Sequence, residues 1–178
     1  MAGSRGDERA WIRGAQSGSV PDLEALFRHH WPRAYRAAYL VVHDSAAAED
    51  IAQEAFLAAI RGLDRFDRRR PFGPWLHRIV VNRAIDWSRS RALRRESGDA
   101  WLGLAEAPVP PESEHGQTLA AALADLSPEH RAVIVMRHLL EYTPGEIAQA
   151  LGLPRGTVNS RLRRGLDELA NRLEQDVQ

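Results

Sequence analysis

The sequence predicts an all-α protein of two small helical domains joined by a flexible linker. Apolar residues recur every three or four positions through residues 20–96 and again through residues 118–178, which is the spacing of helices with one buried face. Between these regions, residues 97–117 are rich in Gly, Pro, Ser and acids and have no sustained period, which is typical of a linker. Residues 1–19 are polar and Gly/Ser-rich, and we expect a flexible N-terminus there that leads into a short helix near Trp11 and Ile12. No segment shows the pattern of a strand.

Composition and charge narrow the classes of protein. The chain has no Cys, which excludes disulfides and thiolate zinc sites. No apolar run approaches the roughly 18 residues of a membrane span, and the first residues have no apolar signal segment, so we expect a cytoplasmic location and no membrane insertion. The net charge is +0, but residues 61–95 hold eleven Arg against three Asp, a net of +8. A basic block interrupted by Trp and Ile favours a nucleic-acid surface over a solvated tail.

Two helices are expected before this basic block. Residues 21–39 carry apolar side chains at steps of three and four, with Pro32 as a site for a kink. Residues 46–61 follow, entered through Asp44 or Ser45, with a broad apolar face. The other side of this second helix presents Asp50, Gln53, Glu54, Leu57 and Arg61. A leucine among acids favours a protein-contact surface over a purely solvated face, although single exposed leucines are common.

The basic block begins as a loop and continues as a helix from Pro74 to about Arg95. Arginines bind phosphates, an amide reads a base edge, and aromatic rings stack on bases. The candidates for such a surface are Phe66, Arg68, Arg69, Arg70, Phe72, Trp75, Arg78, Asn82, Arg83 and Arg89. The alternative is that the aromatic residues belong to the core, and we favour that alternative for Trp87.

The second domain begins with two further helices. The first starts at Thr118, and Ser127-Pro128-Glu129 is a cap followed by proline that opens the second, which we expect to extend to Glu141.

Residues 143–169 then predict two helices joined by a tight turn. Thr143 and Glu146 form a capping box, Gly152 supplies a left-handed stop, and Pro154 starts the next helix. In the second helix one apolar stripe is expected from Val158, Leu162, Leu166 and Leu169. A helix–turn–helix presents its other faces to the major groove, and here they carry Arg155, Thr157, Asn159, Ser160, Arg161, Arg163 and Arg164. The alternative is an ordinary helical hairpin with a solvated face.

Three segments together resemble an extracytoplasmic-function (ECF) sigma factor, the two-domain class of bacterial sigma-70-type initiation factors. They are AEDIAQEAFLAAI, FDRRRPFGPWLHRIVVNRAID and LSPEHRAVIVMRHLLEYTPGEIAQALGLPRGTVNSRLRRGLDEL, and the likeness covers nearly all of residues 20–172. The resemblance implies a protein that is not an enzyme, with no catalytic residues, metal or cofactor. It implies three partners: core RNA polymerase through its β′ clamp helices and β flap, promoter DNA, and a possible anti-sigma factor.

The resemblance also implies roles for the two domains. Residues 20–96 match sigma domain 2, in which Asp50, Gln53 and Glu54 would grip the β′ clamp helices, bordered by Leu57 and Arg61. The loop of residues 64–73 would capture a flipped base of the −10 element, and the helix after it, with Trp75, Arg78, Asn82 and Arg83, would read and melt that element. Residues 118–178 match sigma domain 4, in which residues 155–164 would read the −35 element. Gly73-Pro74 departs from the small hydroxyl residue often found before the Trp, which leaves the −10 base preference open.

Other functions fit only parts of the sequence. A helix–turn–helix regulator that acts as a dimer without polymerase leaves residues 46–95 without a role. A helical metal-dependent hydrolase would use acids such as Glu49 and Asp50, but these point about 100° apart and no His completes a site. His29 and His30 are likewise adjacent, with no third ligand at a suitable spacing. An anti-sigma or scaffold role would leave the basic faces unused.

Overall fold

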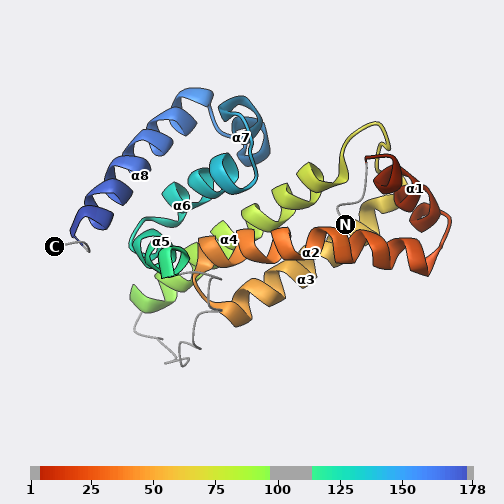
Figure 1. The fold of residues 1–178 in the computed structure, drawn as a ribbon, viewed down its shortest axis with the longest axis horizontal. Helices are drawn as coiled ribbons and strands as arrows, with labels where there is room; N and C mark the ends of the chain where they lie inside the picture. The colour runs from red at the N-terminus through yellow and green to blue at the C-terminus, as the bar shows by residue number, and fades with distance from the viewer. Residues whose placement is uncertain (1–4, 97–113, 176–178) are drawn as a thin grey trace.

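The computed structural model describes residues 5–96 and 114–175, and all regular elements within these ranges are helical. Figure 1 shows two groups of helices side by side, α1–α4 and α5–α8. Residues 97–113, most of the expected linker, lie outside the described residues. None of the described helices is long and apolar enough to cross a membrane.

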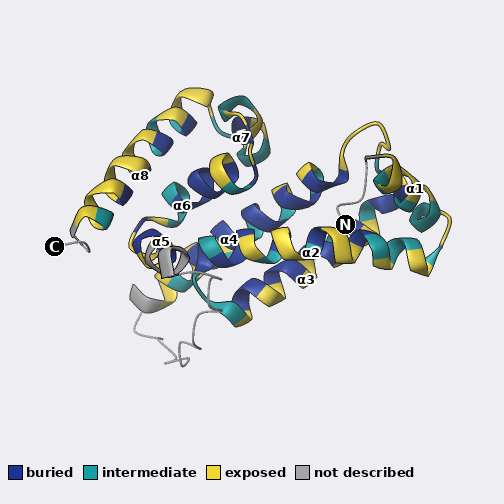
Figure 2. Cartoon of the chain, in the orientation of Figure 1, coloured by how far each residue is buried: buried dark blue, intermediate teal, exposed yellow. Residues whose placement is uncertain are grey.

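The first group is built on three helices that pack against one another: α2 (Val20–Val42), α3 (Ser45–Gly62) and α4 (Phe72–Glu96). Asp44 caps α3 by accepting a hydrogen bond from the Ala47 N–H at 3.0 Å, as its sequence position suggests. The largest side chains with almost no exposure here include Leu26, Val41, Leu76 and Val80. Figure 2 shows that the buried parts of these helices lie along their inner faces, and that much of α8 and of the loop before α4 is exposed.

The short helix expected near Trp11 and Ile12 is present, and it takes up most of the N-terminal segment of residues 1–19. From Arg5 to Gln16 the chain forms helix α1, which packs on α2. Its Ile12 is fully buried, and the Gln16 side-chain amide donates to the Leu63 carbonyl at 2.8 Å. Trp11 and Ala15 also pack against the core, and the Glu8 carboxylate lies 2.8 Å from His30 Nε2, so apolar contacts and long-range polar contacts together dock a segment whose composition is polar.

The second group contains α5 (Glu114–Ala124), α6 (Pro128–Ile134), α7 (Pro144–Leu151) and α8 (Arg155–Gln175). The capping box of Thr143 and Glu146 is confirmed, as is the left-handed Gly152 with φ 65°. The helix expected to reach Glu141 instead ends in a π-helical turn, η2 (Val135–Leu139). Glu141 itself has φ 63°, a left-handed conformation that is unfavourable for a residue with a side chain.

The apolar stripe of α8 differs from the expected one at a single position. Val158, Leu162 and Leu169 are buried, but Leu166 is 39% exposed. Gly165 takes its place against α6, where an added Cβ would lie 3.0 Å from Ile134 Cδ1. The buried stripe therefore follows steps of four, three and four, and the missing side chain of glycine is what lets α6 and α8 approach.

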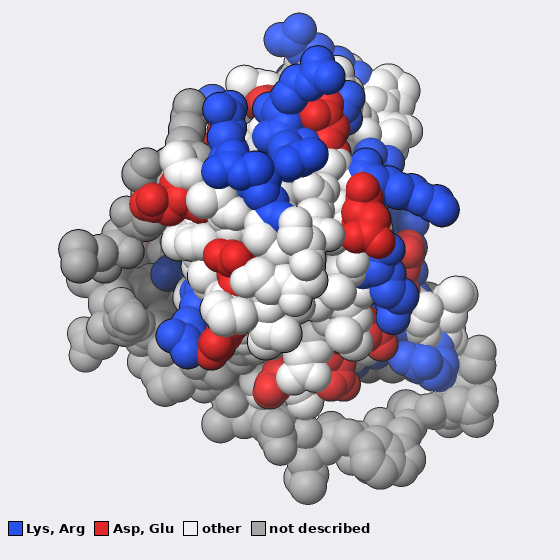
Figure 3. All heavy atoms as spheres, turned by 90° about the vertical axis from the view of Figure 1, so that its right-hand side faces the viewer, with Lys and Arg blue, Asp and Glu red and all other residues white. Residues whose placement is uncertain are grey.

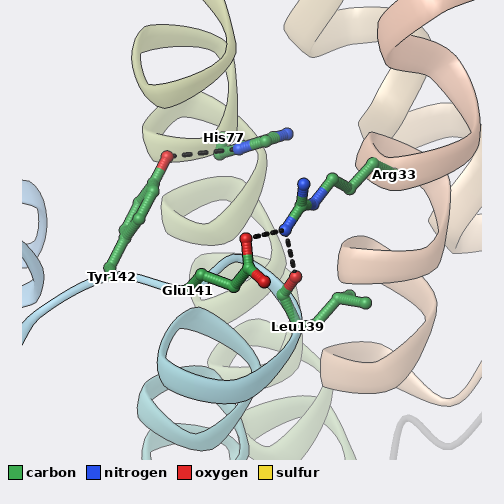
Figure 4. A network of polar contacts seen from close by, with 5 residues as sticks. All are labelled: Arg33, His77, Leu139, Glu141 and Tyr142. Carbon is green, nitrogen blue, oxygen red and sulfur yellow. Dashed lines mark hydrogen bonds and ion pairs between the residues drawn. The ribbon is translucent and has the colours of Figure 1, made fainter. Parts of the chain in front are cut away.

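The two groups share an interface, formed by α2 and α4 on one side and by α5–α7 on the other. Figure 4 shows its polar contacts. Arg33 of α2 donates to the Leu139 carbonyl and lies 3.3 Å from the Glu141 carboxylate. His77 Nδ1 of α4 lies 3.2 Å from the Tyr142 hydroxyl, and both residues are buried. The halves expected from the sequence are thus packed together in this structure.

Candidate polymerase and nucleic-acid interface

The outer face of α3 presents the residues that the sequence suggests for a protein contact. Asp50, Gln53, Glu54, Leu57 and Arg61 are all exposed, and the helical spacing brings them to one side. Leu57 is 53% exposed. Ile60, three residues farther along this helix, is 39% exposed and was not predicted to belong to this face. From helical spacing alone, Ile60 could equally belong to the core. Its exposure makes the apolar part of this face larger than the sequence indicates.

An ion pair joins this acidic face to the basic helix α4. The Arg83 guanidinium donates a hydrogen bond to the Glu54 carboxylate. A residue predicted to contact polymerase is therefore paired with a residue predicted to contact DNA. A hollow of about 300 Å³ lies beside this pair, with Asp50, Asp86 and Trp87 among its lining residues. The two predicted surfaces are therefore adjacent and electrostatically coupled.

The loop before α4 exposes Arg68, Arg69 and Arg70. Figure 3, which views the side of the molecule where α1 and this loop lie in Figure 1, shows clusters of basic side chains with acidic ones between them. Arg69 lies 3.7 Å from Asp67, which partly offsets the positive charge of the loop. An exposed run of guanidinium groups can bind phosphate oxygens.

The aromatic residues proposed to stack on bases are partly buried, which was the alternative left open by the sequence. Phe72 is only 3% exposed, because α4 begins at Phe72, two residues before the expected Pro74. Phe66 and Trp75 are half-buried and stack on each other with ring centroids 4.7 Å apart. In this conformation the Phe72 ring is part of the core. The Phe66 and Trp75 rings stack on each other, so the stacked face of each ring is not available to a base.

Two residues of α4 that the sequence assigns to DNA contact the second half of the molecule instead. The Asn82 amide donates to its own helix at the Arg78 carbonyl and to the Ala150 carbonyl of α7 at 3.2 Å. Arg89 Nε donates to Glu129 at 2.9 Å. Burial raises the pKa of Glu129, but the Arg89 hydrogen bond and charge outweigh it and leave the pKa below its usual range. Arg78 remains exposed.

The second helix of the helix–turn–helix, α8, begins where the Pro154 carbonyl accepts the Thr157 N–H at 3.0 Å. Four of its predicted DNA residues are exposed and three are half-buried. The exposed ones are Arg155, Asn159, Arg163 and Arg164. The half-buried ones are Thr157, Ser160 and Arg161. A row of exposed arginines behind a short polar start matches the chemistry of major-groove recognition.

Two histidines between the halves, the buried His77 and the half-buried His43, were not predicted from the sequence. Burial lowers the pKa of His77 to about 3, with the His30 and Arg33 charges as smaller causes. Burial also lowers the pKa of His43 to about 4, and the Arg131 charge adds to this. Both histidines are therefore neutral at pH 7. Among the described residues, no group of three or more His, Asp or Glu is placed to hold a metal ion.

Comparison with known proteins gives matches over both halves. The family profile of sigma-70 region 2 matches residues 26–94, and that of sigma-70, region 4 matches residues 116–169. The chain is 35% identical over 158 residues to the ECF RNA polymerase sigma factor SigL of Mycobacterium tuberculosis, covering 86% of this chain and 89% of SigL. It is 31% identical over 158 residues to SigW of Bacillus subtilis, covering 78% and 82%. SigE of Mycolicibacterium smegmatis is 36% identical over 162 residues, covering 87% of this chain but 63% of SigE.

Solved structures share the fold. The structure of CnrH in complex with the cytosolic domain of CnrY superposes with a TM-score of 0.69 at 29% identity, covering 96% of this chain and 99% of that one. RpoE from Bartonella quintana, solved in complex with the anti-sigma factor NepR, gives a TM-score of 0.71 at 24% identity over 87% of this chain and 98% of that one. The arrangement of helices is therefore one that other proteins adopt.

Proposed function

This chain belongs to the extracytoplasmic-function sigma factors of the sigma-70 family, and we propose that it binds core RNA polymerase and directs it to promoters through −10 and −35 elements. Residues 20–96 would act as sigma domain 2 and residues 118–178 as sigma domain 4, with residues 97–117 as the linker, in the cytoplasm. The observation that carries the proposal is the presence, in one chain, of an exposed acidic face on α3, a basic α4 beside it and an arginine-bearing helix–turn–helix.

We assign the polymerase contact to the outer face of α3. Asp50, Gln53 and Glu54 would meet the β′ clamp helices, and Leu57 and Arg61 would border that contact. An apolar side chain in the centre of a polar ring is the arrangement that protein interfaces favour, because the ring excludes water from it. The exposure of Leu57 supports this assignment.

We assign −10 recognition and opening to the loop and to α4. The exposed Arg68, Arg69, Arg70 and Arg78 would hold phosphates, in a salt-dependent way. Flipping a base costs a few kcal/mol, which stacking of about 1–3 kcal/mol per base on aromatic rings can offset. Trp75 and Phe66 are the rings nearest the surface, and they would have to part to accept a base. No nucleotide hydrolysis enters this scheme.

We assign −35 recognition to α8, and we infer that promoter opening requires the two halves to separate. Asn82 and Arg89 each contact the second half, so DNA can reach them only after the bonds to the Ala150 carbonyl and to Glu129 are exchanged. Membership of the class also implies an anti-sigma factor as a partner, such as the NepR protein solved with Bartonella quintana RpoE.

A helix–turn–helix regulator that acts without polymerase is not favoured, because residues 26–94 match sigma-70 region 2 and that alternative gives them no role. The sigma factor family is in general not enzymatic. Transcription in vitro with purified core polymerase over a promoter library tests the proposal. Failure of the polymerase to start at any template when this protein is added would contradict it.

Two variants separate the proposed roles. Arg164→Ala should weaken binding to −35 duplex DNA and reduce the slope of log affinity against log salt by about one. Asn82→Ala should leave −35 binding intact and impair opening, followed by permanganate reactivity of unpaired thymines. Arg28→Ala, which changes an exposed arginine paired with Glu24 on α2, is the control for both. If both variants failed equally at the polymerase-binding step, the assignments would be wrong.

A further inference from the structure

A cavity lies at the interface between the two halves and is separate from the residues assigned above. Its volume is about 500 Å³, which falls in the range of small-molecule sites. Trp87 and Arg91 of α4 line one side, and Pro128 and Arg131 of α6 line the other. His43, the residue that ends α2, also borders it. The cavity therefore draws its walls from both halves.

Arg131 is the unusual member of this lining. Its side chain is only 8% exposed, and its Nε has no hydrogen-bond partner. None of the ion pairs between described residues includes it. Burial lowers the pKa of Arg131 to about 10, with the Glu129 charge opposing this, so the guanidinium stays charged at neutral pH. A buried charge without a partner is costly, and proteins normally satisfy it with an opposite charge.

The carboxylate whose charge acts on Arg131 and the carboxylate that follows His43 in the chain are both already engaged. Glu129 accepts from Arg89 at 2.9 Å, and Asp44 accepts from Arg91 at 2.7 Å. None of the described residues that line the cavity is acidic. His43 adds a second unsatisfied nitrogen, because its Nε2 is buried without a partner. The cavity thus has one guanidinium without an ion-pair partner among the described residues and one further nitrogen without a hydrogen-bond partner.

The rest of the lining is apolar or aromatic. The Arg91 guanidinium lies over the Trp87 ring, 5.0 Å from its centroid, and Val42, Ala92 and Ala124 complete the wall. A guanidinium fork binds carboxylate and phosphate groups in a bidentate way, and the apolar wall suits the body of an organic molecule. We propose that this cavity is a binding site for a small organic anion, whose carboxylate or phosphate pairs with Arg131 and whose apolar body lies against Trp87.

The test uses the full chain and four probes: benzoate, phenyl phosphate, inorganic phosphate and the neutral benzamide. Binding is followed by the indole N–H signal of Trp87 in ¹H–¹⁵N NMR spectra, assigned with Trp87→Phe. Benzoate or phenyl phosphate should shift this signal in a saturable way at millimolar concentrations, and benzamide should not. Inorganic phosphate should bind more weakly, because it lacks the apolar body. The proposal is overturned if neither organic anion shifts the signal, or if benzamide shifts it equally.

Variants of Arg131 locate the site. Arg131→Met keeps the length of the side chain and removes its charge, so affinity should fall at least about tenfold, as for the loss of a charged hydrogen bond. The variant should fold, because removing an unpaired buried charge is neutral or stabilising. Arg131→Lys keeps the charge without the fork and should retain weak binding. Arg28→Met, at an arginine whose side chain is 74% exposed, should leave affinity unchanged.

Two results would overturn the assignment to Arg131. One is undiminished binding by Arg131→Met, and the other is an equal loss in Arg28→Met, which would indicate general attraction to a basic surface. A thermal unfolding series gives an independent readout, since a ligand held by the native state raises the midpoint in proportion to its occupancy. That rise should be present in the parent protein and absent in Arg131→Met. None of these measurements needs polymerase or DNA, so their outcome does not depend on whether the proposed function is correct.

Discussion

Acidification should destabilise this protein through the histidines buried between its halves. Burial lowers the pKa of His77 to about 3 and that of His43 to about 4, from a usual value of 6.5. A histidine with a depressed pKa is neutral in the folded state and takes up a proton more readily when unfolded. Its contribution to stability is therefore intact above pH 6.5 and declines as the pH falls below that value towards the folded-state pKa.

The size of the effect follows from the proton uptake of the unfolded chain. Between about pH 7.5 and about pH 5.5, each histidine that stays neutral in the folded state lowers the free energy of unfolding by about 1.4 kcal/mol. His77 and His43 together should lower it by roughly 3 kcal/mol over this interval. Because His77 contacts Tyr142 of the other half, part of this loss should appear as weaker packing of the two halves.

Urea unfolding at several pH values, followed by circular dichroism, measures this slope. His77→Gln replaces the imidazole with an amide that does not titrate, so the pH-dependent loss over this interval should shrink by about 1.4 kcal/mol. His138→Gln changes an exposed histidine and should leave the slope unaltered. The reasoning is refuted if His77→Gln shows the full slope of the parent protein, or if stability rises on acidification.

Three further variants test the local structure by thermal and urea unfolding. Gly165→Ala should be about 1–3 kcal/mol less stable than Gly156→Ala, since its Cβ would lie 3.0 Å from Ile134 Cδ1 and 3.1 Å from His130 Cβ of α6. Gly156→Ala, with no heavy atom within 4 Å, should be neutral or stabilising, and equal stability of the two variants would contradict the close packing at Gly165. Thr143→Ala removes the N-cap of α7 and should cost about 1 kcal/mol, whereas an unchanged midpoint would show that the cap is redundant. Glu141→Gly relieves a φ of 63° and should stabilise by up to about 1 kcal/mol despite loss of the exposed pair with Arg33; a clear loss would mean that this pair outweighs the strain.

Local chemistry that depends on neighbours in the sequence was predictable. The side chains of Thr143 and Glu146 form the capping box, and Gly152 adopts a left-handed conformation because it has no Cβ, so the corner of the helix–turn–helix appears as expected. The exposed face of α3 follows from helical periodicity in the same way. Whether these faces bind polymerase and DNA stays a prediction.

Packing between distant segments was not predictable from the pattern. Asn82 and Arg89 are polar residues on a basic helix. Their spacing does not reveal which group accepts their hydrogen bonds: a carbonyl of α7, a carboxylate of α6 or a nucleic acid. α4 begins at Phe72, two residues before the proline that was expected to start it, because proline can occupy more than one position in the first turn of a helix. Phe72 is therefore a helical residue that packs in the core. Leu166 and Gly165 exchanged roles because a periodic stripe does not reveal where two helices approach most closely.

The contact between Glu54 and Arg83 has a consequence for the order of events at a promoter. Each member neutralises the other while the protein is alone. A partner that recruits the carboxylate leaves the guanidinium unpaired on the neighbouring helix, where its attraction for a phosphate is greatest. By thermodynamic reciprocity, docking on one helix strengthens DNA affinity on the other, and DNA strengthens docking by the same factor. A single short-range pair would thus make the free factor a weak DNA binder and the assembled one a stronger binder, without any change in the fold.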